Sequence, residues 1–436
     1  MATLTRPAPQ NGRAHEHSRN VARLAEHEAL ASAQRWFSRE REWIDSHHLQ
    51  ICRIGAPTFF EQQRAEWLAA KLESLGWAAH RDRAGNVVAR FRDASAEPRF
   101  VISAHLDTVF APGKPEQIAQ SPDGRFTGPG VSDNGSGLAA LVALARLLGE
   151  TRELQELASS LLLVANVGEE GEGNLSGMRY LCSHTPEIEH VKGFIVLDGP
   201  ALDHITMQAL ASRRFEISFN GPGGHSWNDH GVPNPVHALA ELVSAFLHSA
   251  SEHVPADRAD RCSWNFGVLE GGRSVNSIPT HARAKLDLRS EDGAVLDELS
   301  SLLSAAAGKA LERENRNARG GRLTAKVKDL GSRPGGRVCD NAPLLEAIQS
   351  VDAHLHIRSR LNCASTDANI PLSLGFEAIS IGTGGTGGGA HTEQEWYRPE
   401  RRELGLWRIL LLLAALNSEA LGAARDHIDH GEPVRA

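Results

Sequence analysis

The sequence predicts an α/β domain that is interrupted by a smaller α+β domain. Apolar segments typical of buried strands alternate with helix-like segments before residue 209 and again after residue 331, and this alternation is typical of a sheet flanked by helices. Between these limits the expected order changes to β-α-β-β-α-β, which is the order of a ferredoxin-like unit. Histidine and acidic residues also follow several expected strands directly, where ligands gather in open α/β sheets.

The α/β domain is expected to begin with two helices, at residues 27–46 and 59–75, where apolar residues recur three and four positions apart. Further strands are expected at residues 87–91, 100–104, 160–167, 194–197 and 378–381, with helices at 137–148 and 344–354 and at the C-terminus. Continuous apolar runs such as 160–167 are typical of strands covered on both faces, so they predict a mostly parallel sheet.

The inserted domain is expected to span residues 209–331. Its strands are predicted at residues 214–219, 264–269, 282–288 and 323–330, and its helices at 235–248 and 294–313. The chain then divides into a flexible polar tail (1–25), an α/β domain (26–208 and 332–436) and the insertion.

Composition and charge narrow the classes of function. The net charge of −8 gives no support for nucleic-acid binding, and the apolar run at residues 409–416 is too short to cross a membrane. The five cysteines are scattered without a CxxC pair, which argues against a disulfide framework and against a thiolate zinc site. The first twenty residues lack the apolar core of a secretory signal. We therefore expect a cytoplasmic protein without nucleic-acid or membrane partners.

Seven side chains of metal-binding type lie just after strand-like runs, before a helix or in a glycine-rich segment. They are His105, Asp107, Asp133, Glu169, Glu170, Asp198 and His391. His105 and Asp107 are two positions apart, so on a strand they face the same way. Because the carboxyl ends of the strands meet at one edge of such a sheet, these residues predict one metal site assembled from distant segments.

The residue types indicate which cations would bind. Histidine together with carboxylates suits zinc, cobalt or manganese. Asp133, Glu170 and Asp198 supply three negative charges, so two divalent ions with a bridging hydroxide would balance the charge. Of the adjacent Glu169 and Glu170, one can bind metal while the other takes a proton from metal-bound water, as in metal-assisted hydrolysis.

Each of these motifs also has a simpler explanation when taken alone. A single HxD is a weak signal, the Glu169–Glu170 pair could be a solvated loop, Asp198–Gly199 could be a turn, and a glycine-rich run could be a linker. A solvated surface does not account for so many acidic residues beside buried strands, because uncompensated carboxylates are costly there.

The motifs in order resemble those of a known family. They are SAHLDTV, GVSDNGSGLAAL, NVGEEGEGN, VLDGP, GPGGHSW, GGRSVNSIP, STDAN and GGGAHTEQEW. The chain is similar to the dinuclear zinc metallopeptidase and deacylase family of peptidase T, carboxypeptidase G, acetylornithine deacetylase and succinyl-diaminopimelate desuccinylase. STDAN, together with Asp198, resembles the peptidase T-like branch.

The resemblance implies two Zn²⁺ per subunit, with Co²⁺ or Mn²⁺ as substitutes. His105 and Asp198 would hold one ion, and Glu170 and His391 the other. Asp133 would bridge them, and its peptide bond to Asn134 would be cis. Asp107 would support His105, and Glu169 would be the general base. The α/β part would be the zinc-peptidase catalytic domain.

The resemblance also implies that the insertion is a lid and dimerisation domain in a homodimer. His225 would reach the partner's active site and stabilise an oxyanion, while Asn276 and Arg289 would bind substrate. From the residues alone, His225 is a turn residue, Asn276 an Asx-turn residue and Arg289 an outward strand charge.

Hydrolysis of an amide bond in a small peptide is the function that these observations favour. An N-acyl amino acid amidohydrolase is the alternative, since the metal motifs do not distinguish the substrates. A catalytically silent metal- or peptide-binding protein and a two-metal phosphoesterase are more remote: the spare carboxylate of Glu169 argues against the first, and the lack of a phosphate-cradling loop disfavours the second.

Overall fold

The computed structural model describes residues 19–92, 94, 97–254 and 261–417. The chain divides into two compact units, Met1–Gln208 with Arg337–Ala436, and Ala209–Gly336. The second unit ends five residues after the expected limit of 331, because its last strand remains paired as far as Arg333.

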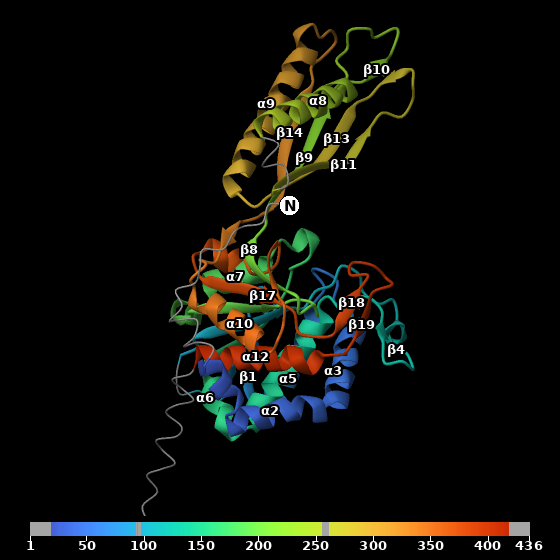
Figure 1. The fold of residues 1–436 in the computed structure, drawn as a ribbon. Coiled ribbons are helices and arrows are strands. Elements are labelled where there is room, and N and C mark those ends of the chain that lie inside the picture. The colour runs from blue at the N-terminus through green and yellow to red at the C-terminus, as the bar shows by residue number, and fades with distance from the viewer. Residues whose placement is uncertain (1–18, 93, 95–96, 255–260, 418–436) are drawn as a thin grey trace, which may run out of the picture. The chain divides into compact units, whose positions relative to one another are not determined.

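A mixed sheet forms the centre of the first unit (Figure 1). Its order is β1 (Trp77–Arg81), β2 (Val87–Phe91), β6 (Leu161–Asn166), β3 (Phe100–His105), β7 (Gly193–Leu197), β17 (Glu377–Ile381), β8 (His204–Ala209) and β15 (Gly336–Arg337), and β16 (Arg360–Ala364) pairs with β8. The pairs β6–β3, β3–β7 and β7–β17 are parallel, while β1–β2, β2–β6 and β17–β8 are antiparallel. The expected sheet is thus mostly parallel only at its centre. Toward each edge the sheet adds an antiparallel strand, β2 beside β6 and β8 beside β17.

Helices pack around this sheet. They are α2 (Glu28–Arg39), α3 (Arg41–Arg53), α4 (Gln62–Ser74), α5 (Gly135–Glu150), α6 (Gln155–Ser159), α7 (Ser176–His184), α10 (Pro343–His354), α11 (Asn369–Ser373) and α12 (Arg402–Leu416). The expected helix at 27–46 is two helices that meet at Glu40. The helix expected from residue 59 begins at Gln62, because Phe59 has a positive φ of 75°.

The expected N-terminal tail lies only partly within the described residues. Residues 1–18 lie outside them, whereas the backbone at residues 19–25 is mostly helical. Val21 and Leu24 in this segment are buried, so residues 19–25 belong to the folded unit. Burial of these apolar side chains supplies the reason, since it stabilises the helix against the loss of conformational freedom.

Helices α5 and α12 are largely buried, so both read as nearly continuous apolar runs. The buried Arg408 of α12 makes a two-pronged contact with Asp352 of α10, with N–O distances of 2.6 and 2.7 Å. The run at 409–416 is a largely buried segment of this last helix. Among the described residues, no helix is long and apolar enough to cross a membrane. All five cysteines lie within the described residues, and none of them forms a disulfide.

A small antiparallel sheet joins the glycine-rich segment to the centre of the chain. Its order is β18 (Thr386–Gly388), β19 (Trp396–Arg398), β5 (Phe126–Thr127) and β4 (Ala119–Gln120). Residues 386–388 of the glycine-rich segment form a strand. This pairing places His391 and Glu395, which lie between β18 and β19, in the same region as the loop before α5.

The second unit has the order β9 (Ala211–Asn220), α8 (Pro235–His253), β11 (Cys262–Gly271), β13 (His281–Ser290), α9 (Gly293–Arg316) and β14 (Thr324–Arg333). The four strands form an antiparallel sheet in the order β11-β13-β9-β14. Helices α8 and α9 pack on each other and on this sheet (Figure 1). The expected β-α-β-β-α-β order is present, and a short ribbon of β10 (Gly224–His225) and β12 (Ser277–Ile278) extends it.

Candidate metal centre

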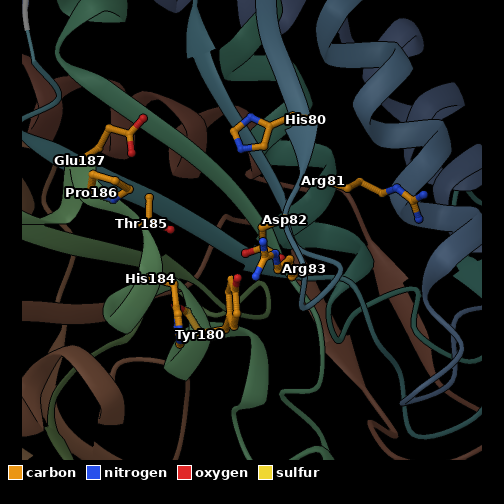
Figure 2. Close-up of a pocket in the computed structure, with 9 residues that line it drawn as sticks. All are labelled: His80, Arg81, Asp82, Arg83, Tyr180, His184, Thr185, Pro186 and Glu187. Atoms are coloured by element: carbon orange, nitrogen blue, oxygen red, sulfur yellow. The ribbon is translucent and has the colours of Figure 1, made fainter.

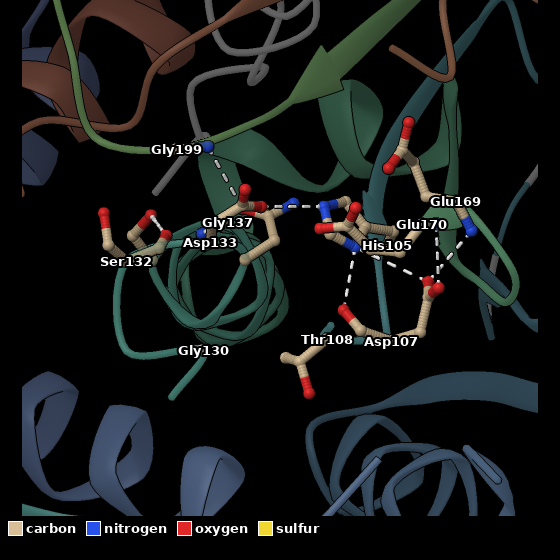
Figure 3. Close-up of polar contacts among 12 residues, drawn as sticks. His105, Asp107, Thr108, Gly130, Ser132, Asp133, Gly137, Glu169, Glu170 and Gly199 are labelled. Carbon is tan, nitrogen blue, oxygen red and sulfur yellow. Dashed lines mark hydrogen bonds and ion pairs between the residues drawn. The ribbon is translucent and has the colours of Figure 1, made fainter. Parts of the chain in front are cut away.

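His105 ends strand β3, and its ring lies between two carboxylates. Its Nδ1 lies 3.0 Å from the backbone carbonyl of Asp107, and its Nε2 lies 3.1 Å from Oδ1 of Asp133 (Figure 3). A ring nitrogen facing a carbonyl must donate, so the neutral ring directs its Nε2 lone pair at the Asp133 carboxylate. The Nε2 lone pair of His105 and the Asp133 carboxylate are both acceptors, so this contact requires a proton or a cation between them. Burial lowers the pKa of His105, but its hydrogen bonds to Asp107 and Asp133 outweigh burial and raise this pKa well above its usual value.

Asp133 places its two carboxylate oxygens toward two different histidines. Oδ1 faces His105, and Oδ2 lies 3.2 Å from Nε2 of His391. The peptide bond from Asp133 to Asn134 is cis, as the resemblance implies. Gly137 lets α5 begin close to this bond, because a Cβ there would lie 2.3 Å from Asn134 Oδ1 and 2.6 Å from the Leu197 carbonyl.

Glu170 and Asp198 bring further negative charge to the same region. Oε1 of Glu170 lies 3.0 Å from Nε2 of His391. Burial, followed by repulsion from Glu169, raises the pKa of Glu170 to about 8. Burial, followed by repulsion from Asp133, raises the pKa of Asp198 to about 7. Carboxyl groups that resist ionisation in this way are ones that a bound cation would stabilise as carboxylates.

The ligand atoms of these residues form three adjoining groups. Atoms within 4.8 Å of one another come from His105, Asp133 and Asp198, from Asp133, Glu170 and His391, and from His105, Glu169 and Glu170. Asp133 belongs to the first two groups and offers a different oxygen to the histidine of each. The donor set of nitrogen and oxygen atoms therefore fits divalent cations, and the Asp133 carboxylate is common to two of the groups.

Asp107 connects the His105 segment to the Glu169–Glu170 segment. Its two carboxylate oxygens accept the backbone N–H groups of Glu169 and Glu170, each at 2.9 Å (Figure 3). The hydroxyl of Thr58 donates a third hydrogen bond at 3.0 Å. Burial raises the pKa of Asp107, but its contacts with His105 and these backbone groups lower it below the usual value. Asp107 thus stays ionised and holds the two segments together.

Glu395 is a residue that the sequence interpretation did not assign. It is 2% exposed, and its carboxylate accepts the backbone N–H groups of Gly130, Ser132 and Asp133, each at 2.7 Å. This carboxylate joins the segment of His391 to the loop that carries Asp133. The only signal for it in the sequence is an acidic residue four positions after His391, within GGGAHTEQEW.

Asp367 of the STDAN segment is a second unassigned carboxyl. It is fully buried and accepts a hydrogen bond of 2.6 Å from the Asn166 side chain at the end of β6. Burial, followed by repulsion from Glu169, raises its pKa to about 8. The segment was noted as a family motif, but only the tertiary structure places this carboxyl near Glu169.

His225 and Asn276 lie together in the second unit. Residue 225 pairs with Ser277 on the β10–β12 ribbon, and the Asn276 carbonyl accepts the N–H of Ser226 at 3.0 Å. Nδ1 of His225 accepts the backbone N–H groups of Trp227 and Asn228 at 3.2 and 3.3 Å. These bonds place the proton of the neutral ring on Nε2.

Arg289 is distant from that pair. It lies near the opposite end of β13, about 26 Å along the strand from His281, at the usual rise of a β-strand. Its Nε donates to Asp287 at 2.8 Å, and the side chain is half-exposed. The structure therefore does not bring Arg289 together with His225 and Asn276 within one chain.

A separate groove with a volume of about 450 Å³ lies beside the end of β1 (Figure 2). It is lined by His80, Arg81, Asp82, Arg83, Tyr180, His184, Thr185, Pro186 and Glu187, and none of the seven predicted metal-site residues is among them. Asp82 Oδ1 already accepts three backbone N–H groups from residues 84–86. The groove is therefore distinct from the metal centre.

An α/β sheet whose strand ends gather histidines and carboxylates into adjoining ligand groups has the architecture of a metal-dependent hydrolase. Residues 101–412 match the model of peptidase family M20/M25/M40, and the chain belongs to this family. The resemblance drawn from the sequence motifs is confirmed.

Two similar curated proteins carry different names. A probable carboxypeptidase from Ajellomyces capsulatus is 23% identical over 287 residues, which cover 60% of this chain and 64% of that protein. A succinyl-diaminopimelate desuccinylase from Paracoccus denitrificans is 28% identical over 276 residues, which cover 59% of this chain and 70% of that protein. The chain thus matches just under two thirds of the first protein's length.

Solved structures share the fold over most of this chain. A tripeptidase from Staphylococcus aureus matches with a TM-score of 0.68 and 18% identity, covering 86% of this chain and 97% of that one. The aminopeptidase PepT from Bacillus cereus matches with a TM-score of 0.67 and 19% identity, covering 86% and 98%. At these identities the likeness establishes the fold.

Proposed function

We propose that the protein is a dizinc hydrolase that cleaves an amide bond in small peptides, as an aminopeptidase, dipeptidase or tripeptidase. The observation that carries the proposal is the Asp133 carboxylate, whose two oxygens face the histidines of two ligand groups. His105 and Asp198 would hold one cation, Glu170 and His391 the other, and Asp133 both. Two bound cations supply Lewis-acid polarisation and lower the pKa of water to near neutrality. Zinc fits this donor set, and cobalt or manganese can substitute.

Glu169 is the general base of the proposed reaction. It takes a proton from the attacking water and returns it to the leaving nitrogen. Its side chain is 6% exposed, and its backbone is held by Asp107 at 2.9 Å, so it is positioned beside Glu170 with little freedom. Asp107 in turn orients the His105 ring.

His225 of a partner copy is proposed to stabilise the oxyanion, with a homodimer formed through residues 209–331. The proton on Nε2 supports this role, because that atom can donate a hydrogen bond to a developing negative charge. Such a donor typically contributes about 3–4 kcal/mol to transition-state stabilisation. Asn276, beside His225, and Arg289 are proposed to bind the substrate.

An N-acyl amino acid amidohydrolase is the second candidate function. It is supported by the name of the Paracoccus denitrificans relative, a desuccinylase. Asp198 and the STDAN segment favour a peptidase instead.

The experiment that tests the proposal is hydrolysis of di- and tripeptides and N-acyl amino acids by zinc- or cobalt-loaded protein, with Glu169→Ala as control. Cleavage of peptides supports the peptidase, and preference for acyl amino acids supports the second candidate. Failure to cleave any of these amides, with both metals bound, overturns the proposal.

A further inference from the structure

Four large apolar side chains are exposed on two neighbouring segments of the first unit. Phe59 and Phe60 are 64% and 73% exposed, and Val109 and Phe110 are 39% and 43% exposed. The two segments are joined by a parallel bridge between Pro57 and Thr108. Scattered single apolar residues on a surface need no explanation, but gathered ones often mark a binding site.

Both segments are attached to residues of the metal centre. The hydroxyl of Thr58 donates to Asp107 at 3.0 Å, and Val109 follows Asp107 by two positions. The carboxylate of Glu61 accepts the N–H of Phe59 and the N–H of Gly168, each at 3.1 Å, and Gly168 directly precedes Glu169. The aromatic pair therefore sits on a turn bonded to the segments of Asp107 and of Glu169.

The turn holds Phe59 in an unfavourable backbone conformation. Its φ is 75°, a value that bulky residues rarely adopt. The turn is nevertheless closed by a 2.7 Å hydrogen bond from the N–H of Phe60 to the Pro57 carbonyl. Such strained residues cluster at functional sites, where the surrounding structure maintains them. Here the strained backbone carries two exposed phenyl rings.

The chemistry of these segments specifies what they can bind. Residues 57–60 are PTFF and residues 108–112 are TVFAP, so neither carries a charge. A charged substrate side chain finds no partner on them, whereas an apolar one gains from burial against the rings.

We propose that Phe59, Phe60, Val109 and Phe110 receive a bulky apolar side chain that adjoins the scissile amide. The substrate class is then peptides, or acylated amino acids, with a leucine-like or phenylalanine-like residue at that position. This inference rests on the proposed hydrolysis and adds its specificity.

The test compares the cobalt-loaded wild-type protein with Phe59→Ala/Phe60→Ala and, separately, Val109→Ser/Phe110→Ser. Leu374→Ala is the matched control, because Leu374 is also exposed, at 56%, on the first unit. The substrates are paired peptides and acyl amino acids in which glycine, alanine, leucine, phenylalanine or glutamate flanks the amide on either side. Thermal melting and size-exclusion chromatography verify folding and mass.

We expect kcat/KM for the leucine and phenylalanine substrates to fall at least about tenfold in each double variant. The glycine and alanine substrates should change less than about twofold, and Leu374→Ala should match wild type on all of them. Equal losses on every substrate, or no loss in either variant, overturn the inference while the proposed hydrolysis stands. A changed molecular mass together with equal losses identifies the surface as an interface between copies and also overturns it. If the wild type cleaves no substrate, the proposed function fails and the specificity fails with it.

Discussion

The carboxylate of Glu395 accepts the backbone N–H of Asp133 at 2.7 Å. It thereby joins the segment that carries His391 to the loop that carries Asp133. Because the same carboxylate also accepts the backbone N–H groups of Gly130 and Ser132, this buried side chain satisfies three backbone hydrogen-bond donors.

Replacing Glu395 with Gln should weaken both folding and metal binding. The amide NH₂ would face at least one backbone N–H, and leaving such a buried donor unpaired costs about 1–3 kcal/mol. We expect a lower melting temperature and a weaker zinc affinity by calorimetry. Glu393→Gln, at an exposed position two residues away, is the control. Unchanged zinc affinity in Glu395→Gln would show that the Asp133 loop is positioned without Glu395.

Asp133→Ala should remove both metals, whereas His391→Ala should remove one. Asp133 belongs to two ligand groups and His391 to one. Elemental analysis after dialysis measures the metal content per chain. Full occupancy in Asp133→Ala would contradict the shared-carboxylate arrangement.

Glu169→Ala should lower kcat by about 10²–10⁴-fold, the usual contribution of a general acid or base. Its metal content should remain at the wild-type level, since the other ligands remain in place. Glu170→Ala is the comparison, and it should lose metal from the group that contains His391. Loss of metal from Glu169→Ala instead would mean that Glu169 and Glu170 have the opposite roles.

A mixture of Glu169→Ala and His225→Ala chains should regain activity if each site uses Glu169 of one copy and His225 of the other. Only the mixed dimer then has one intact site, so random assembly restores about one quarter of wild-type activity. Each variant alone is the control. No recovery after the chains are unfolded and refolded together would exclude the partner role of His225.

The metal-free protein should lose stability as the pH rises. The pKa values of Asp198, Glu170 and His391 are raised to about 7, about 8 and about 9, and that of His105 is also raised. The folded state then binds more protons than the unfolded chain, so stability present at low pH is lost as pH passes through these values. Because the ordinary pKa of a carboxyl lies near 4, we expect the melting temperature to fall between about pH 5 and about pH 9.

Saturating zinc should reduce this fall, because bound cations stabilise the ionised carboxylates and the neutral histidines. Calorimetry in buffers of different ionisation enthalpy should also show protons released when zinc binds. A melting temperature that rises with pH in the metal-free protein would contradict the shifted pKa values.

The sequence by itself determined the elements whose side chains follow a local pattern. The apolar runs of β3, β6 and β7 are recognisable because both faces of these strands are buried. The β-α-β-β-α-β order of the second unit was recognisable for a different reason: its strands and helices each have one apolar and one polar face, so apolar positions recur with the period of the element. The acidic residues and histidines directly after such strands were predicted, as a group, to form the metal centre.

Only the tertiary structure decided the relationships that depend on segments far apart in the chain. The polar edge strand β1 and the antiparallel edges of the sheet were not predicted, because pairing partners leave little local trace in short strands. Nor did the sequence show that Glu395 holds the Asp133 loop, or that Thr58 bonds to Asp107. A hydrogen bond between distant segments depends on how the whole chain packs, whereas a buried strand can be recognised from the apolar residues of its own local sequence.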